Sequence, residues 1–124
     1  MIRSLATLLI LCLVSLPMPV AGESPTVAAS NISIINGRQI IDIGAKGGYL
    51  PRQTLAKANM PTAIKVKTNG TFDCSSAIAI PSLGYEASLP PTGETLIDVP
   101  PQPAGSTLRG LCAMGMYSFT VQFK

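Results

Sequence analysis

The chain has 124 residues, enough for one small domain with a single hydrophobic core, and its 9 Lys and Arg against 6 Asp and Glu give a formal net charge of +3. Because the basic residues are scattered and no aromatic residues are interleaved with them, the sequence does not predict a nucleic-acid partner. The chain has no His, which removes the usual base of Ser and Cys triads, the imidazole ligands of catalytic zinc and the two-His ligand set of blue copper. Its few carboxylates are dispersed, so we do not expect an enzyme.

Residues 1–22 have the layout of a secretory signal. Arg3 supplies the positive start, residues 5–16 are almost wholly apolar, and small residues precede Glu23, where we expect the mature chain to begin. This layout predicts export to a periplasmic or other extracytoplasmic location. The alternative is an uncleaved membrane anchor formed by residues 2–20, although the apolar run is well short of the roughly 20 residues that span a bilayer.

Residues 23–30 are small and polar and include a Pro, which is typical of a linker, so we place the folded domain at residues 31–124. The domain begins with an Ile-rich stretch that leads to Asn36-Gly37, the strongest short-range hairpin signal, and residues 39–43 resume a β-branched run. The Gly-rich residues 44–48 lack the spacing of a phosphate-binding loop, so we interpret them as a flexible turn.

The rest of the domain is a series of short apolar runs separated by Gly and Pro. Ile64 and Val66 alternate with Lys65 and Lys67, as expected for a strand with one buried and one wet face. Further candidate strands are residues 77–80, 85–89, 95–99, 107–111 and 117–124. No segment has a sustained helical period. Seven or eight short strands in about 90 residues predict an all-β fold, a Greek-key β-sandwich.

Three sulfur-bearing side chains lie within five residues near the end of the chain: Cys112, Met114 and Met116. Cys74 is the only other cysteine outside the N-terminal apolar segment. Thiolates and thioethers are soft ligands that select Cu(I), so these four residues are a candidate metal site. Two plainer interpretations stay open: Cys74 and Cys112 form a structural disulfide, and the two Met side chains fill space in the core.

The predicted sandwich gives these residues a way to meet. Loops cluster at the two ends of a sandwich, and we expect Cys74 at the start of one strand and Cys112 at the end of another. The two cysteines can therefore meet at one pole, although their spacing in the sequence neither proves nor forbids this.

From residue 48 onward the chain contains, in order, the segments Tyr49-x-Pro51, Pro61, Cys74, Ile80-Pro81-x-Leu83-Gly84 and Cys112-x-Met114-Gly115-Met116-Tyr117. On these residues it resembles the cupredoxin-like domains of bacterial copper-handling, Cu(I)-binding proteins. Ordinary cupredoxins carry His in the final loop and at the upstream position, whereas this sequence looks like a variant with Cys74 upstream and no His. The resemblance implies Cu(I) binding without electron transfer. Residues 30–45 have no clear counterpart and are expected to be an added hairpin.

Ligand chemistry agrees with that implication, because Cu(II) prefers nitrogen and oxygen ligands and an all-sulfur site should hold copper reduced. We therefore expect an exported protein that sequesters Cu(I), or passes it to a copper exporter or to a cuproprotein under assembly. The ligands would be Cys74, Cys112, Met114 and Met116. The alternative is a metal-free β-sandwich with a Cys74–Cys112 disulfide that binds a partner.

Overall fold

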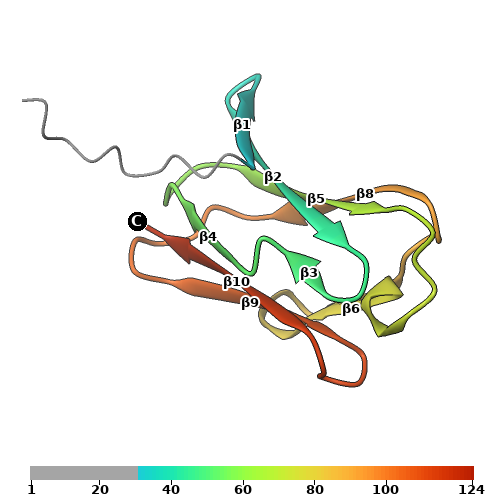
Figure 1. The fold of residues 1–124 in the computed structure, drawn as a ribbon. Coiled ribbons are helices and arrows are strands. Elements are labelled where there is room, and N and C mark those ends of the chain that lie inside the picture. Colours follow the sequence, from blue (N-terminus) through green and yellow to red (C-terminus); the bar gives the residue numbers. More distant parts are fainter. Residues whose placement is uncertain (1–30) are drawn as a thin grey trace, which may run out of the picture.

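The computed structural model describes residues 31–124, which form two β-sheets packed face to face (Figure 1). The predicted signal at residues 1–22 and the predicted linker at residues 23–30 lie outside the described residues. The first sheet contains β1 (Ile32–Ile35), β2 (Arg38–Ala45), β3 (Tyr49–Leu50), β5 (Thr62–Thr68) and β8 (Gly93–Val99). The second contains β4 (Gln53–Ala56), β6 (Ala77–Ile80), β7 (Tyr85–Ser88), β9 (Thr107–Cys112) and β10 (Ser118–Phe123).

The first sheet has the strand order β1-β2-β5-β8, with β3 also paired to β2. β1 and β2 form the expected hairpin, and both turn residues, Asn36 and Gly37, have positive φ angles of 51° and 75°. This is the left-handed pair that a two-residue type I′ turn requires. β2 then runs parallel to β5, which is antiparallel to β8.

The second sheet has the order β4-β10-β9-β6-β7. β10 is parallel to β4 and antiparallel to β9, while β9 is antiparallel to β6. Strands that are distant in the sequence are therefore neighbours in both sheets, as in a Greek-key arrangement, and the predicted all-β sandwich is confirmed. β3 and β4 were not predicted.

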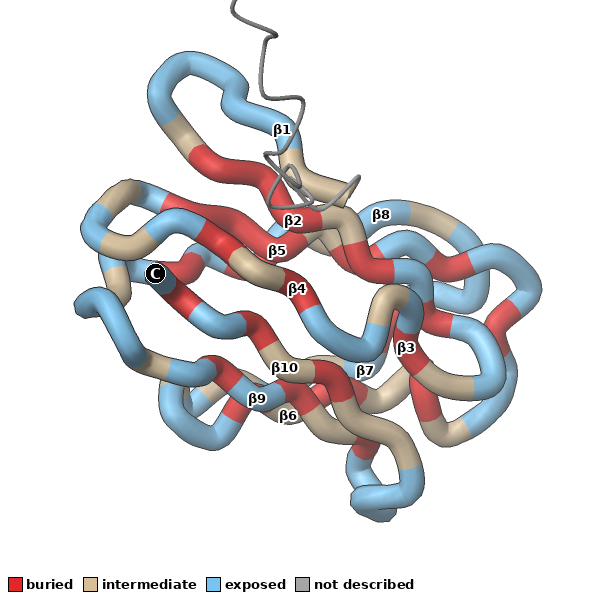
Figure 2. The backbone as a smooth tube through the Cα atoms, turned by 60° about the vertical axis from the view of Figure 1, so that its left-hand side comes forward, coloured by how far each residue is buried: buried red, intermediate tan, exposed pale blue. Residues whose placement is uncertain are grey.

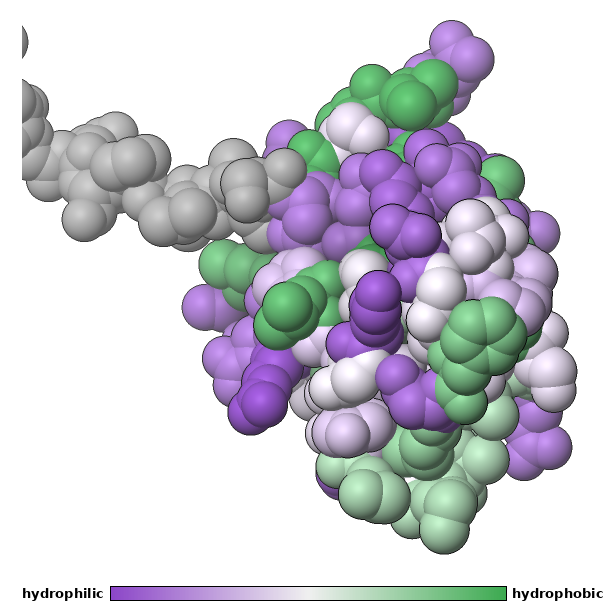
Figure 3. All heavy atoms as spheres, turned by 45° about the vertical axis from the view of Figure 1, so that its right-hand side comes forward, coloured by the Kyte–Doolittle hydropathy of each residue, from purple (hydrophilic) through white to green (hydrophobic). Residues whose placement is uncertain are grey.

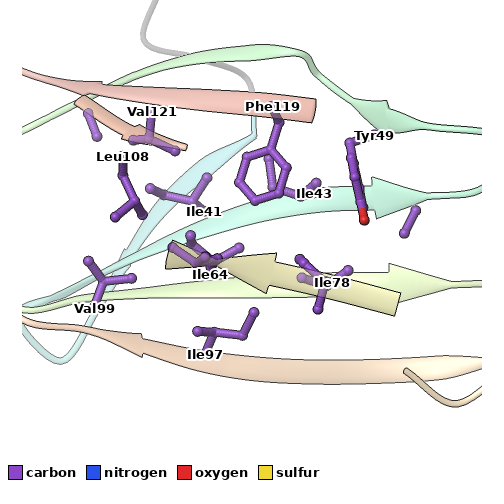
Figure 4. Close-up of a cluster of buried hydrophobic side chains, with 14 of the residues drawn as sticks. Ile41, Ile43, Tyr49, Ile64, Ile78, Ile97, Val99, Leu108, Phe119 and Val121 are labelled. Atoms are coloured by element: carbon purple, nitrogen blue, oxygen red, sulfur yellow. The ribbon is translucent and has the colours of Figure 1, made fainter. Parts of the chain in front are cut away.

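The core lies between the two sheets and is built by alternation along each strand. Figure 4 shows Ile41, Ile43 and Ile64 of the first sheet facing Phe119 and Val121 of the second. All five side chains are buried. Figure 2 shows the same pattern along the chain, with buried segments in the strands and exposed segments in the loops.

The only helical elements among residues 31–124 are two 3₁₀ turns, η1 (Cys74–Ser76) and η2 (Pro81–Leu83). This corrects one expectation: Cys74 begins η1 and does not start a strand. The reason is local, because the Asp73 carboxylate accepts a hydrogen bond from the Ser75 N–H and caps the turn. In this part of the chain no helix is long and apolar enough to cross a membrane.

Candidate metal centre

The loop between β9 and β10, residues 113–117, is closed by backbone hydrogen bonds at its base. The Cys112 N–H donates to the Tyr117 carbonyl at 3.0 Å, and the Gly115 N–H donates to the Cys112 carbonyl at 2.9 Å. Gly115 has φ of +71°, a left-handed conformation that glycine adopts without strain. The Cys-x-Met-Gly-Met-Tyr run is thus a compact turn. Cys112 is the last residue of β9, as the sequence predicted when it placed this cysteine at the end of a strand.

Strand pairing brings Cys74 to this turn. Cys112 lies opposite Ile78 in the β6–β9 pair, and the Ala113 N–H donates to the Ala77 carbonyl at 2.9 Å. Cys74 opens the η1 turn that leads directly into β6. The register of β6 against β9 therefore determines that the two cysteines meet at one end of the sandwich.

Both cysteines are free thiols, and they face each other closely enough to interact through a side-chain hydrogen bond. That hydrogen bond raises the pKa of Cys74. Burial alone would raise the pKa of Cys112, but the hydrogen bond from Cys74 and those from backbone N–H groups outweigh burial and lower it. The pair therefore favours a state in which Cys112 is the thiolate and Cys74 carries the proton.

The backbone of the loop surrounds the Cys112 sulfur with donors. The Tyr117 N–H donates to Cys112 Sγ at 3.3 Å, and the N–H groups of Met114 and Met116 also interact with this sulfur. The Met114 N–H interacts with the Cys74 sulfur as well. The loop is thus shaped to stabilise negative charge on sulfur.

The methionine side chains are not part of the core. Met114 is 79% exposed and Met116 is 67% exposed, although both are large and apolar. The interpretation that they fill core space is therefore wrong. The backbone N–H groups of both residues interact with the cysteine sulfurs, whereas both side chains are exposed. Each thioether is therefore attached to the backbone beside the cysteine pair but faces solvent.

A second layer of residues holds the thiol-bearing segments. The Asp73 carboxylate accepts a hydrogen bond from the Gly47 N–H at 2.7 Å, and the Tyr49 hydroxyl donates to the Ser75 carbonyl at 3.2 Å. Hydrogen bonds from Ser75 and Gly47 lower the pKa of Asp73, so the cap stays ionised. Burial, with the nearby Cys112, Cys74 and Asp73, raises the pKa of Tyr49 well above its usual value, so its hydroxyl stays a donor.

The sequence alone did not predict this second layer. The Asp73-x-Ser75 spacing, in which an Asp caps a turn two residues on, was the available signal for Asp73. Tyr49 belongs to the segments that carry the sequence resemblance, but nothing local to it predicts the hydrogen bond to Ser75.

The residues of this site fit a soft monovalent metal ion. Two thiols lie near enough to shift each other's pKa, one of them is favoured as a thiolate, and two exposed thioethers belong to the same turn. Such a donor set suits Cu(I) and offers none of the nitrogen that Cu(II) prefers. Among residues 31–124, no group of three or more His, Cys, Asp or Glu side chains is arranged to hold a metal ion.

Solved structures share this architecture. The metal-binding domain of CopA, the Cu(I)-exporting P-type ATPase of Streptococcus pneumoniae D39, determined with Cu(I), has a TM-score of 0.65 and 24% identity over 75% of this chain and 92% of that domain. A copper-binding protein in its apo form, determined by NMR in solution, has a TM-score of 0.67 and 26% identity over 75% of this chain and 94% of its own. The chain has the fold of these copper-binding domains. This likeness supports the copper-related, cupredoxin-like fold that the sequence resemblance implied, although no protein-family model and no curated protein sequence matches the chain.

Proposed function

We propose that this protein binds Cu(I) through the sulfur atoms of Cys74, Cys112, Met114 and Met116. The observation that carries the proposal is that the β6–β9 pairing brings two free thiols to one turn, where the backbone of the loop that bears both methionines stabilises Cys112 as a thiolate. Thiolate is the form that binds metal, and a thiolate already favoured before binding lowers the cost of deprotonation. The fold shared with two copper-binding domains supports the same metal.

The sulfur set would serve either one three-coordinate Cu(I) ion or two ions that share a thiolate. It carries out no catalysis in this proposal and transfers no electron, because an all-sulfur site keeps copper reduced. The protein would sequester copper outside the cytoplasm or pass it to a copper exporter or to a cuproprotein under assembly. The signal-like residues 1–22 support the exported location, and the resemblance to a domain of a Cu(I) exporter supports the exporter as partner.

An anaerobic titration of the reduced full-length chain with Cu(I), in competition with a chelator, tests this function. We expect tight binding that Cys74→Ser or Cys112→Ser abolishes, because each change removes a charged ligand. Cys12→Ser is the matched control, since it makes the same chemical change in the N-terminal apolar segment and should leave the affinity unchanged. Full Cu(I) affinity in both site variants would overturn the copper proposal. The remaining account would then be a metal-free, partner-binding sandwich.

A further inference from the structure

The two methionines of the loop border two different surfaces. Met116 lines a pocket of about 450 Å³ whose wall also contains Lys46, Arg52 and Tyr117. Met114 lines a wider groove of about 780 Å³ over β6, β7 and β9, and Glu86 is the charged residue of that groove. Of the described residues that line the groove, none is Lys or Arg. The candidate copper loop therefore has a basic side and a side that is not basic.

The basic pocket has charges that are free to meet a partner. Lys46 and Arg52 are both exposed, and within residues 31–124 the salt bridges join Arg38 to Asp98 and Lys67 to Asp42, so neither pocket cation is paired. Asp73 accepts a hydrogen bond from Gly47 of the pocket wall, but its carboxylate is also occupied by Ser75. The pocket thus presents two unpaired cations beside the exposed thioether of Met116.

The surface around these cations contains apolar side chains that a partner could cover. Leu50 is 69% exposed and lines the same pocket as Met116. Figure 3 turns the loop-bearing end of the sandwich toward the viewer, and the lowest part of that view, which is the β9–β10 loop of Figure 1, is apolar beneath a more hydrophilic region. Protein–protein interfaces combine apolar side chains with charged ones, and here exposed Leu50 and Met116 line the same pocket as Lys46 and Arg52.

We propose, on the basis of the copper-binding function above, that this basic pocket docks an acidic partner protein, one with carboxylates beside its own copper ligands. Met116 is then the thioether that faces the partner. Complementary charge raises the rate of encounter and fixes orientation more than it adds affinity. In the exchange, a Cu–S bond to a partner thiolate forms as a Cu–S bond to this chain breaks. Copper stays Cu(I), and each partner thiol that binds copper gives up its proton, one of them to Cys74 and the other to solvent.

The test measures Cu(I) transfer from the loaded full-length chain to two synthetic peptides under anaerobic conditions. Both peptides have a Cys-Gly-Gly-Cys core, flanked in one by four Glu and in the other by four Lys. The test variant is Lys46→Glu with Arg52→Glu. The matched control is Lys57→Glu with Lys124→Glu, which makes the same change in charge on exposed residues at the opposite end of β4 and β10. Lys46→Gln with Arg52→Gln is a milder second variant.

We expect the test variant to slow transfer to the Glu peptide by about tenfold at low salt, with the Gln variant intermediate and the control within about twofold of the parent. The difference in transfer rate between the test variant and the parent should disappear at high salt, because the charges are exposed and salt screens them. Met116→Leu should slow transfer to the Glu peptide more than Met114→Leu. Equal rates for the test and control variants, with Cu(I) affinity intact, would overturn the docking proposal alone. Failure of the parent chain to bind Cu(I) would instead overturn the proposed function.

Discussion

Cys74 and Cys112 have the same chemistry but different surroundings. Cys112 is 2% exposed and accepts hydrogen bonds from the loop backbone, whereas Cys74 is half-buried and hydrogen-bonds with Cys112. The pKa of Cys112 is consequently lowered and that of Cys74 raised. In the proposed site, an arriving Cu(I) ion would meet one sulfur already favoured as a thiolate and would displace the proton of the other.

This asymmetry predicts how the apo protein titrates. In a Cys12→Ser background, one thiol should deprotonate below the ordinary range and the other above it. Cys74→Ala should raise the pKa of Cys112, because the sulfur stays buried and loses a donor, while Cys74→Ser keeps a donor and should leave that pKa low. Ultraviolet thiolate absorbance as a function of pH measures both steps. Identical titrations for the Ala and Ser variants would show that Cys74 does not stabilise the Cys112 thiolate.

The methionines should be separable from the cysteines. Leu keeps the bulk and apolarity of Met, so Met114→Leu with Met116→Leu should change the free energy of unfolding by less than about 1.5 kcal/mol per site. Neutral thioethers bind more weakly than thiolates, so we expect the double variant to lose a weaker second Cu(I), or the speed of its transfer, while tight binding remains. The measurements are the number of Cu(I) ions bound per chain and the rate of Cu(I) transfer. If the double variant matched the parent in both, the metal site would consist of the two cysteines alone.

The β9–β10 hairpin is the element that holds the candidate metal loop in position. Gly110 and Phe119 lie directly opposite each other in its two strands, and the Phe119 ring occupies the space above the glycine. The ring is 1% exposed and packs edge-on against Tyr49, with centroids 5.2 Å apart. The position of Cys112, two residues beyond Gly110, therefore depends on this packing.

Gly110→Ala should destabilise the domain by about 1–3 kcal/mol, the usual cost of overpacking. A Cβ atom at position 110 would lie 2.1 Å from Cε1 of Phe119, which forces the ring or the strand to move. Gly44→Ala is the control, because it is also a strand glycine and its Cβ would lie 3.8 Å from the nearest atom. Urea unfolding measures both. Equal urea midpoints for the two variants would show that the Phe119 ring can move aside without loss of stability.

The elements differ in how far the sequence determines them. Asn36-Gly37 predicted its hairpin because the turn conformation is set by the two residues themselves. β4 was missed because Gln53–Ala56 has no β-branched alternation and pairs with the distant β10. The meeting of Cys74 with Cys112 was expected from the clustering of loops in a sandwich, but the sequence could not establish it, since the register of β6 against β9 is a long-range property. Because Asp73 caps η1, Cys74 lies in a 3₁₀ turn and not at the start of a strand, but it still lies at the predicted site.

At the scale of the whole molecule, the sandwich keeps the candidate copper site at the end that also carries the basic pocket. The first described strand, β1, belongs to the hairpin that the sequence resemblance left without a counterpart, and two of its Ile side chains, Ile34 and Ile35, are each 52% exposed.

Export remains a proposal that rests on residues 1–22, which lie outside the described part of the chain.

Export can be checked on the protein in its own cells. We expect the chain in an extracytoplasmic fraction to begin at Glu23, because small residues precede that position and the apolar run is short for an anchor. Intact mass and N-terminal peptide mass spectrometry of the fractions measure this. A full-length chain in the membrane fraction would favour the uncleaved anchor of residues 2–20, and one in the cytoplasm would contradict export.

The central claim is that sulfur atoms alone bind the copper, and X-ray absorption at the copper edge of the Cu(I)-loaded chain tests it most directly. We predict a reduced copper edge with sulfur as the only neighbouring atoms, and no intense blue band when Cu(II) is added, because no His is present. Nitrogen or oxygen neighbours that persist in the loaded protein, or a spectrum unchanged when Cys74 and Cys112 are both replaced by Ser, would contradict the account.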